Sequence, residues 1–377
     1  MLRCVPEPAV KANSGGSLRE ALDDFLELRE VAADPAGDRA EREQPHMVSR
    51  FYDVVTRFFE YGWGKSFHFA PRRSGEGLHA AQRRQEAGVA GLLGLGPGLR
   101  VVDVGCGVGG PLVNIAQLSG ADITGLNFNA YQIERGWRAL RRAGGVRGAC
   151  DFLLADYMDV PLADGRFDAA YSFEAICHAP DRHRCLSEIW RLLKPGGRIA
   201  LTEWCLTDRF DARDPIHGDI RARVEFANAT PQLPTTSGFI AAVQAAGFEV
   251  LSSRDQALDS DPDFPWYRAL QGRDLSLASL ARVPAGRRFT ATATALLERL
   301  RIAPAGIGES ARILNEAADA LVQAGEEGIL TPCFLVHARK PDAVRIDPSD
   351  SGIARRLTSV LSRLHPERGP CGVWSGA

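Results

Sequence analysis

A glycine-rich turn after a short apolar run carries the strongest chemical signal in the chain. Asp103 lies two residues before Gly105, and Gly107 and Gly109 continue the turn. Glycines let a backbone approach a ligand closely, and the helix that follows offers free N–H groups. The same glycine spacing also occurs in dinucleotide sites. The Asp103 carboxylate favours a ligand with an ammonium and a sulfonium over a pyrophosphate, so we predict S-adenosylmethionine as the cofactor.

Polar side chains follow the next two apolar runs and extend this predicted site. Asn127 ends the second run, where polar residues of open α/β sheets reach ribose hydroxyls. The alternative is that Asn127 caps a helix and Gln132 is solvent-exposed. Asp156, after the third run, could accept a hydrogen bond from the adenine amine or serve as a turn acid. Tyr157 completes the predicted cofactor-binding set.

Seven apolar runs of strand length, separated by helix-length segments, must position these residues. This alternation predicts an α/β fold with a doubly wound, mostly parallel, seven-stranded Rossmann-like sheet. About eighty residues of helical periodicity before the last run predict a helical insertion between the sixth and seventh strands. The runs lie at residues 99–104, 122–126, 150–154, 167–173, 198–203, 248–252 and 333–339.

Changes of pattern along the chain predict four parts. Ser17 and Glu20 have the spacing of a capping box, which indicates a helix in the N-terminal segment. In the tail, aliphatic residues between Ile353 and Leu364 fall on one helical face with arginines elsewhere, which is typical of either an interfacial helix or a helix docked on the core. The predicted parts are an N-terminal helix with a flexible segment at 1–45, a cofactor-binding catalytic domain at 46–255, a region with the helical insertion and the last strand at 256–341, and the tail at 342–377.

Composition excludes several classes of function. Lys and Arg number 45 against 47 Asp and Glu, so the chain lacks the basic excess that nucleic-acid binding requires. Its eight cysteines form no CxxC pair, which predicts an intracellular protein with reduced thiols, without disulfides or a structural metal. No apolar stretch approaches the ~20 residues that span a bilayer. Any membrane contact is therefore expected to be peripheral.

Three further segments, together with the glycine turn through Pro111, resemble motifs of the sterol 24-C-methyltransferases. They are YGWGKSFHF at 61–69, EAICHAPD at 174–181 and EWCLTD at 203–208. The resemblance runs from about residue 50 to 341. It implies methyl transfer from S-adenosylmethionine to carbon 24 of a sterol side-chain double bond, in cycloartenol, zymosterol or a similar sterol. A carbocation would form and then lose a proton. The family also implies a homo-oligomer, with a tetramer as the form expected.

The aromatic segment suits a cationic intermediate. Aromatic faces attract a desolvated cation by about 0.5–2 kcal/mol each, which favours Tyr61, Trp63, Phe67 and Phe69 as the wall of a pocket rather than plain core. Within this segment we expect Tyr61 to be catalytic. The predicted substrate pocket consists of Glu60, Trp63, Phe67, His68, Phe69, Cys177 and Trp204.

The base that removes the final proton has several candidates. Glu174 and His178 follow the fourth strand, and Glu203 lies in the third motif. His is the natural base near neutral pH, whereas a buried Glu needs its pKa raised by desolvation. Glu60 is a further candidate. For each acid, the alternative is a structural role in capping a helix or pairing an Arg.

Two other functions stay open at this point. One is methylation of another small lipid, such as a tocopherol precursor or a fatty-acyl chain, because those enzymes share the glycine turn. The other is a non-catalytic sterol-binding protein with the same fold. For a sterol enzyme without a spanning segment, we expect a cytoplasmic location or peripheral attachment to the endoplasmic reticulum or lipid droplets.

Overall fold

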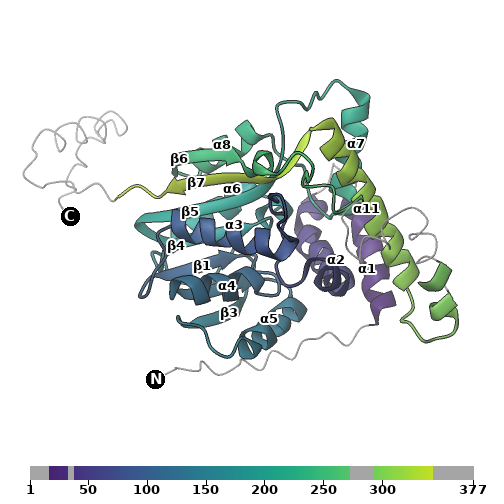
Figure 1. The fold of residues 1–377 in the computed structure, drawn as a ribbon, viewed down its shortest axis with the longest axis horizontal. Helices are drawn as coiled ribbons and strands as arrows, with labels where there is room; N and C mark the ends of the chain where they lie inside the picture. Colours follow the sequence, from purple (N-terminus) through teal and green to yellow (C-terminus); the bar gives the residue numbers. More distant parts are fainter. Residues whose placement is uncertain (1–16, 33–37, 272–291, 295, 343–377) are drawn as a thin grey trace, which may run out of the picture. The chain divides into compact units, whose positions relative to one another are not determined.

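The strands form one seven-stranded sheet in the order β3-β2-β1-β4-β5-β7-β6. The computed structural model describes residues 17–32, 38–271, 292–294 and 296–342 (Figure 1). β1 to β5 pair in parallel, and β7 runs antiparallel between β5 and β6. The mostly parallel seven-stranded prediction is therefore confirmed. The strands are β1 Arg100–Val104, β2 Asp122–Asn127, β3 Cys150–Leu154, β4 Phe167–Phe173, β5 Leu193–Leu206, β6 Glu249–Asp255 and β7 Leu330–Arg339.

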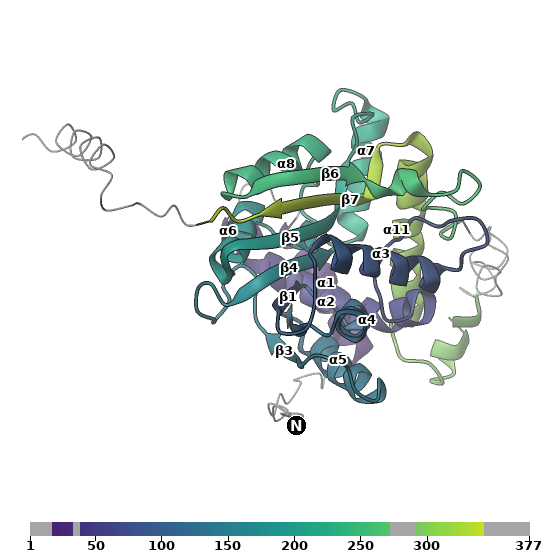
Figure 2. The ribbon, with the colours of Figure 1, turned by 60° about the vertical axis from the view of Figure 1, so that its left-hand side comes forward.

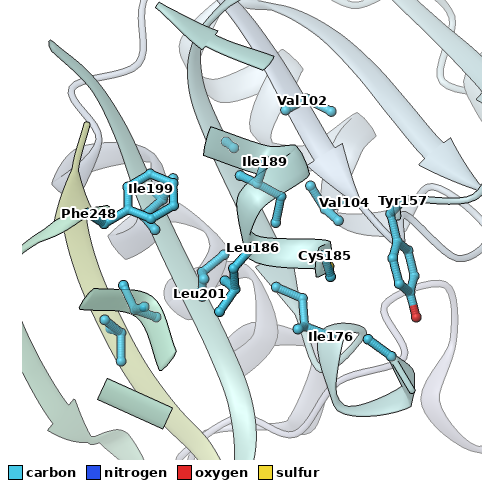
Figure 3. Packing of buried hydrophobic residues seen from close by; sticks show 14 of the residues in the cluster. Val102, Val104, Tyr157, Ile176, Cys185, Leu186, Ile189, Ile199, Leu201 and Phe248 are labelled. Carbon is cyan, nitrogen blue, oxygen red and sulfur yellow. The ribbon is translucent and has the colours of Figure 1, made fainter. Parts of the chain in front are cut away.

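Helices cover both faces of the sheet because each strand alternates buried side chains between the two sides. One core joins β1 and β2 to α3 (Leu78–Leu92), α4 (Gly110–Ser119) and α5 (Ala130–Arg142). The other joins β1, β4 and β5 to α6 (Arg182–Leu192) and α8 (Thr236–Ala245). In this second core Leu186 and Ile189 of α6 pack close to Ile199 and Leu201 of β5 (Figure 3). The two cores make the sheet a rigid support for the residues at its strand ends.

A separate group of helices stands beside the sheet (Figures 1 and 2). Leu22 and Phe25 of the first helix pack with Phe51 and Val55 of the second and Ile313 of α11. The predicted capping box is present: Ser17 N–H donates to Glu20 Oε2 at 2.7 Å, and Glu20 N–H donates to Ser17 Oγ at 3.2 Å. The group consists of α1 (Leu18–Ala32), α2 (Asp38–Trp63), α7 (Pro215–Ala227) and α11 (Ile307–Glu327), and two short 3₁₀ helices, η1 (Ile176–His178) and η2 (Gln256–Asp259), lie elsewhere along the chain.

The structure bears on two of the predicted divisions of the chain. α2 runs through the boundary predicted at residue 45 and continues to Trp63, so the first residues of the aromatic segment are helical. α11 lies between β6 and β7, where a helical insertion is predicted. The predicted tail helix at 353–364 lies outside the described residues. Among the helices that are described, none combines the length and the apolar composition needed to cross a bilayer.

Gly110, the first residue of α4, joins the glycine turn to the aromatic segment and supplies a test of this packing. A Cβ at Gly110 would lie 2.2 Å from the Lys65 carbonyl oxygen and 2.8 Å from the Ser66 nitrogen. Both neighbours are backbone atoms, so Gly110→Ala should destabilise the fold by about 1–3 kcal/mol. Gly91→Ala is the control, because nothing lies within 4 Å of that Cβ in α3 and alanine favours a helix. Urea unfolding measures both variants, and a Gly110→Ala protein as stable as wild type would show that residues 65–66 shift freely.

Candidate active site

A cavity of about 600 Å³ lies over the glycine turn at the carboxyl ends of β1 and β2. Gly105 has φ +74°, and a Cβ there would lie 2.2 Å from the Ala175 Cβ, so only glycine fits this turn. Gly107 follows with φ +53°. The predicted cofactor residues that line this cavity are Asp103, Gly105, Gly107, Asn127, Gln132 and Tyr157.

Asp103 lines this cavity and has one carboxylate oxygen without a protein partner among the described residues. The side chain is 2% exposed, and its Oδ2 has no hydrogen-bond partner in the part of the chain that the structure describes. Burial raises the pKa of Asp103 to about 8, partly offset by the Tyr171 hydroxyl. A buried acceptor without a partner costs about 1–3 kcal/mol, which a ligand ammonium group would recover. The site therefore fits the cationic amino group of S-adenosylmethionine.

Asn127 and Gln132 form one hydrogen-bonded unit beside the glycine turn. The Asn127 amide donates to the Gly107 carbonyl at 3.2 Å and to Gln132 Oε1 at 2.8 Å. Gln132 is buried, and its amide donates to Thr56 Oγ1 of α2 at 3.1 Å. The helix cap is Asn129, whose side chain accepts from the Gln132 N–H. The capping alternative thus applies to Asn129, whereas the Asn127 Oδ1 accepts from the Asn129 N–H at 3.0 Å and Asn127 lines the cavity.

Gly109 and Asp156 do not line this cavity. Gly109 caps α4 with φ +78°, and a Cβ there would lie 2.8 Å from the Phe152 ring. Its role in the structure is packing. Asp156 accepts from the Met158 N–H at 2.8 Å, which is the turn role weighed for it from the sequence. The remaining support for an adenine contact is that Asp156 follows the carboxyl end of β3.

A second cavity, of about 700 Å³, is walled by aromatic rings. Trp63 and Phe69 meet edge to face with centroids 4.7 Å apart, and Phe59 and Phe67 do so at 5.6 Å. Leu321 and its neighbours on α11 supply an aliphatic side. The predicted pocket residues that line this cavity are Trp63, Phe67, His68, Phe69, Cys177 and Trp204.

The two cavities have five lining residues in common, and these mark where they meet. Two are the base candidates Glu174 and His178, from the turn after β4. Phe67 and His68 come from the aromatic segment, and Tyr52 comes from α2.

Glu174 ties the walls of the second cavity together. Its Oε1 accepts from the Phe69 N–H at 2.6 Å, and its Oε2 accepts from the Trp204 indole at 2.7 Å. Burial raises the pKa of this carboxyl well above its usual range. Cys177 lies next to it, and burial likewise raises the pKa of that thiol, so no thiolate forms. Glu174 has φ +55°, a conformation that costs a non-glycine residue about 1–3 kcal/mol.

His178 is held at both ring nitrogens. Its Nε2 lies 2.9 Å from the Tyr52 hydroxyl, and its Nδ1 lies 3.3 Å from the Ala229 carbonyl oxygen. Burial lowers the pKa of His178 to about 4. The imidazole is therefore neutral at physiological pH.

His68 belongs to a buried network that the sequence does not reveal. Its ring stacks on Phe173 at 4.6 Å, and its Nε2 lies 3.2 Å from Glu86 Oε1. Glu86, on α3, also accepts from Ser66 Oγ at 2.6 Å and from the Asn114 amide at 2.8 Å. These contacts fix the polar side of the aromatic segment against α3 and α4.

Comparison with known proteins is specific. Residues 102–201 match the family description "Methyltransferase domain", and residues 278–342 match "Sterol methyltransferase C-terminal". Over 295 residues the chain is 45% identical to cycloartenol-C-24-methyltransferase 1 of Oryza sativa subsp. japonica, covering 78% of this chain and 85% of that protein. It is 36% identical over 342 residues to the sterol 24-C-methyltransferase of Saccharomyces cerevisiae, covering 89% of each. The chain belongs to the sterol 24-C-methyltransferase family.

This membership confirms the resemblance and the prediction of an S-adenosylmethionine-dependent methyltransferase. The fold prediction is supported by a solved structure as well. The cyclopropane synthase MmaA2 of Mycobacterium tuberculosis superimposes with a TM-score of 0.58 at 18% identity, covering 76% of this chain and 95% of that one. At that identity the likeness concerns the fold alone.

Besides Gly109 and Asp156, three predicted residues of this methyltransferase line neither cavity. Glu203 is 1% exposed and accepts from Ser172 Oγ at 2.8 Å and from the Cys177 N–H at 3.0 Å, so it holds the turn rather than facing substrate. Burial raises the pKa of Glu203 to about 7. Glu60 pairs with Arg135 of α5 instead of entering the pocket. Tyr61 is 86% exposed.

The helical geometry of α2 explains these positions. Phe59 and Trp63 are four residues apart and share the face that lines the aromatic cavity, whereas residues 60 and 61 are rotated away from it. The same face carries Tyr52, one heptad before Phe59. Neither Tyr52 nor Phe59 is predicted from the motifs. Extending the helical period back from Trp63 is the sequence signal that would have found both.

The raised pKa of Asp103 predicts a pH-dependent affinity for S-adenosylhomocysteine, the product of the methyl donor. S-adenosylhomocysteine carries an ammonium, which binds the ionised carboxylate, and below pH 8 a growing fraction of Asp103 is protonated. Affinity should therefore rise about tenfold per pH unit from pH 6 toward 8 and level off above it. Asp103→Asn should bind weakly with a flat profile. Calorimetric titrations from pH 6 to 9 measure both, and a flat wild-type profile would contradict this assignment.

Proposed function

We propose that this enzyme methylates carbon 24 of a sterol side-chain double bond in sterol biosynthesis, with a cycloartenol-like sterol as its acceptor. The observation that carries the proposal is the meeting of a cavity suited to a methyl donor with an apolar, aromatic-walled cavity. The names of the Oryza and Saccharomyces relatives support the position of methylation.

The donor side must bind a cationic nucleoside. S-adenosylmethionine supplies a methyl group on a sulfonium. Asp103 pairs with the ligand's ammonium, and the turn at Gly105 and Gly107 leaves room for its backbone contacts. Asn127 and Gln132 line this cavity after β2, where polar residues of open α/β sheets reach ribose hydroxyls.

The acceptor side must enclose a water-insoluble chain and stabilise the cation that methylation creates. The lining of this cavity is mostly apolar and aromatic with a few polar side chains, as in small-molecule sites. Each aromatic face contributes about 0.5–2 kcal/mol to a desolvated cation. Glu174 orients two of these rings through its hydrogen bonds to Phe69 and Trp204. Of the base candidates from the sequence, His178 is neutral and lines both cavities, so it can accept the proton.

The direct test is incorporation of a labelled methyl group from S-adenosylmethionine into cycloartenol, zymosterol, lanosterol and a tocopherol precursor. The expected result is a product methylated at carbon 24 from at least one sterol and none from the tocopherol precursor. Asp103→Asn serves as the inactive control. Label in the tocopherol precursor alone would indicate an enzyme that methylates another small lipid. Sterol binding without methyl transfer would indicate a non-catalytic sterol-binding protein.

Phe59 supplies a test of the aromatic wall in the same assay. Phe59→Leu keeps an apolar side chain but removes the π-face, which stabilises only the cation formed after methyl transfer begins. We expect turnover to fall about 2- to 30-fold with little change in the sterol Michaelis constant. Phe226→Leu is the matched control, because Phe226 is 51% exposed on α7. A raised Michaelis constant with unchanged turnover would make Phe59 a binding wall only.

We further propose that the enzyme works peripherally at a lipid surface and as a homo-oligomer. Sterols are nearly insoluble, and residues 296–302 expose Leu296, Leu297, Leu300 and Ile302 to solvent. The arginines of the predicted tail helix, Arg355, Arg356 and Arg363, form its basic stripe and would add electrostatic attraction to anionic lipid. Size-exclusion chromatography with light scattering tests the oligomer, and a monomer at assay concentration would contradict it.

Liposome sedimentation tests the contribution of the tail to lipid binding. A chain ending at Asp342 should keep its fold and its activity on detergent-solubilised sterol, because the cavity residues all precede that point. It should bind anionic liposomes less than the full chain does, since the basic stripe is gone. Equal binding by both would end the interfacial role of the tail, and loss of folding would favour a docked helix.

A further inference from the structure

Tyr52 lies where the two cavities meet, although it precedes the aromatic segment at 61–69 and all the other motifs. We propose that Tyr52 is a catalytic residue that takes the proton lost by the sterol cation while it passes its own hydroxyl proton to His178. The inference rests on the proposed function and specifies how its last step occurs.

The hydrogen bonds around His178 set the direction of this relay. The Ala229 carbonyl oxygen can only accept, so the Nδ1 atom that lies 3.3 Å from it carries the ring proton. In a neutral imidazole, Nε2 then holds the lone pair. The Tyr52 hydroxyl, 2.9 Å from Nε2, must therefore donate to it. The remaining lone pairs of the Tyr52 oxygen are left as acceptors.

Backbone strain at Ala229 supports a functional role for this arrangement. Ala229 has φ +52°, a conformation that costs a non-glycine residue about 1–3 kcal/mol. Its carbonyl oxygen also accepts from the buried Gln44 amide at 3.1 Å. Two side chains from distant elements thus converge on one strained peptide, and their contacts fix the carbonyl that sets the tautomer of His178.

Burial keeps Tyr52 and His178 uncharged, so the pair can accept a proton. Removal from water lowers the pKa of His178 to about 4 and raises that of Tyr52, so both groups are neutral at physiological pH. A neutral imidazole adds no positive charge beside a cationic donor. A carbocation is a far stronger acid than an imidazolium, so even this weakened base accepts its proton favourably.

The step balances without another reactant. A C–H bond next to the cationic carbon breaks, and its electron pair becomes the new C=C bond. The proton forms an O–H bond to Tyr52, whose original proton forms an N–H bond to His178 Nε2. The charge moves from the sterol to the imidazolium, which returns its proton to solvent after the product leaves.

The other polar groups at the junction are engaged elsewhere. Both oxygens of Glu174 accept protein hydrogen bonds, from Phe69 and Trp204. The two ring nitrogens of His68 face the Phe69 carbonyl and Glu86. Tyr52 and His178 form the pair with a defined donor, a defined acceptor and a place on both cavities.

Tyr52→Phe is the direct test, because it keeps the ring and removes only the hydroxyl. With the enzyme's sterol acceptor, the normal alkene should form about 10²-fold more slowly or worse, and methylated alcohols should appear as water captures the cation. Affinity for S-adenosylhomocysteine and the melting temperature should stay near wild type. Tyr131→Phe on α5 is the matched control, since that hydroxyl contacts Arg57 and Arg135 and not the cavities. Unchanged rate and products in Tyr52→Phe would overturn the proposal.

A double-mutant cycle with His178→Asn separates a relay from independent roles. If the two residues act as one unit, the double variant should lose little more activity than either single variant. Additive losses would overturn the relay. Should Tyr52→Phe fail to fold, normal product from His178→Asn at near-normal rate would overturn it as well. Failure of the proposed function looks different, because wild type itself would then yield no methylated sterol.

Discussion

The buried carboxylate of Glu203 holds the turn on which the junction of the two cavities depends. It accepts from the N–H groups of Ile176 and Cys177 at 3.1 and 3.0 Å and from the Ser172 hydroxyl. Each of these donors, left unpaired in the core, would cost about 1–3 kcal/mol. The chain therefore bends immediately after β4, and Glu174 adopts its positive φ. One structural acid on β5 thus positions two side chains that face the cavities.

From that turn, hydrogen bonds pass outward to the aromatic wall. Glu174 ties the Phe69 backbone and the Trp204 indole, and His178 reaches Tyr52 on α2 and Ala229 after α7. The wall is therefore assembled from helices and loops far apart in sequence, and polar contacts at the junction fix their relative positions. Apolar packing alone tolerates sliding, whereas these directional bonds do not.

The fold could be predicted from the sequence because buried strands appear in it as local runs of apolar residues. Strands β3 and β4 coincide with the predicted runs, since both sides of a parallel sheet are covered and the apolar runs are continuous. The glycine turn could be predicted too. The contact with Ala175 leaves no room for a side chain at Gly105, and the glycine that this requires is visible in the sequence. β5 begins at Leu193, before its predicted run at 198–203. Residues 194–197 have the composition of a turn, so the sequence does not indicate that the strand includes them.

The site was only partly predictable, because a motif identifies a segment but not the direction of each side chain. Tyr61 and Phe59 differ by two positions on one helix, and only the second lines the cavity. Glu203 and Glu174 are both motif acids, yet the backbone amides that claim Glu203 become visible only when β5 and η1 meet. The helical period of α2 places Tyr52 on the cavity face, but its hydrogen-bond partner lies 126 residues away and has no local signal.

A common electrostatic constraint explains why the acids at this site are so deeply buried. Burial raises the pKa values of Asp103, Glu174 and Glu203 and lowers that of His178, so the uncharged form of each is favoured. A positive charge that enters such a region loses its hydration and gains the most from whatever fixed dipoles and π-faces surround it. Of these three acids, Asp103 is the one with an oxygen that has no partner among the described residues, and it lines the donor cavity. The acceptor cavity instead meets the cation with neutral aromatic rings and a neutral base, which can stabilise it without forming a bond to it.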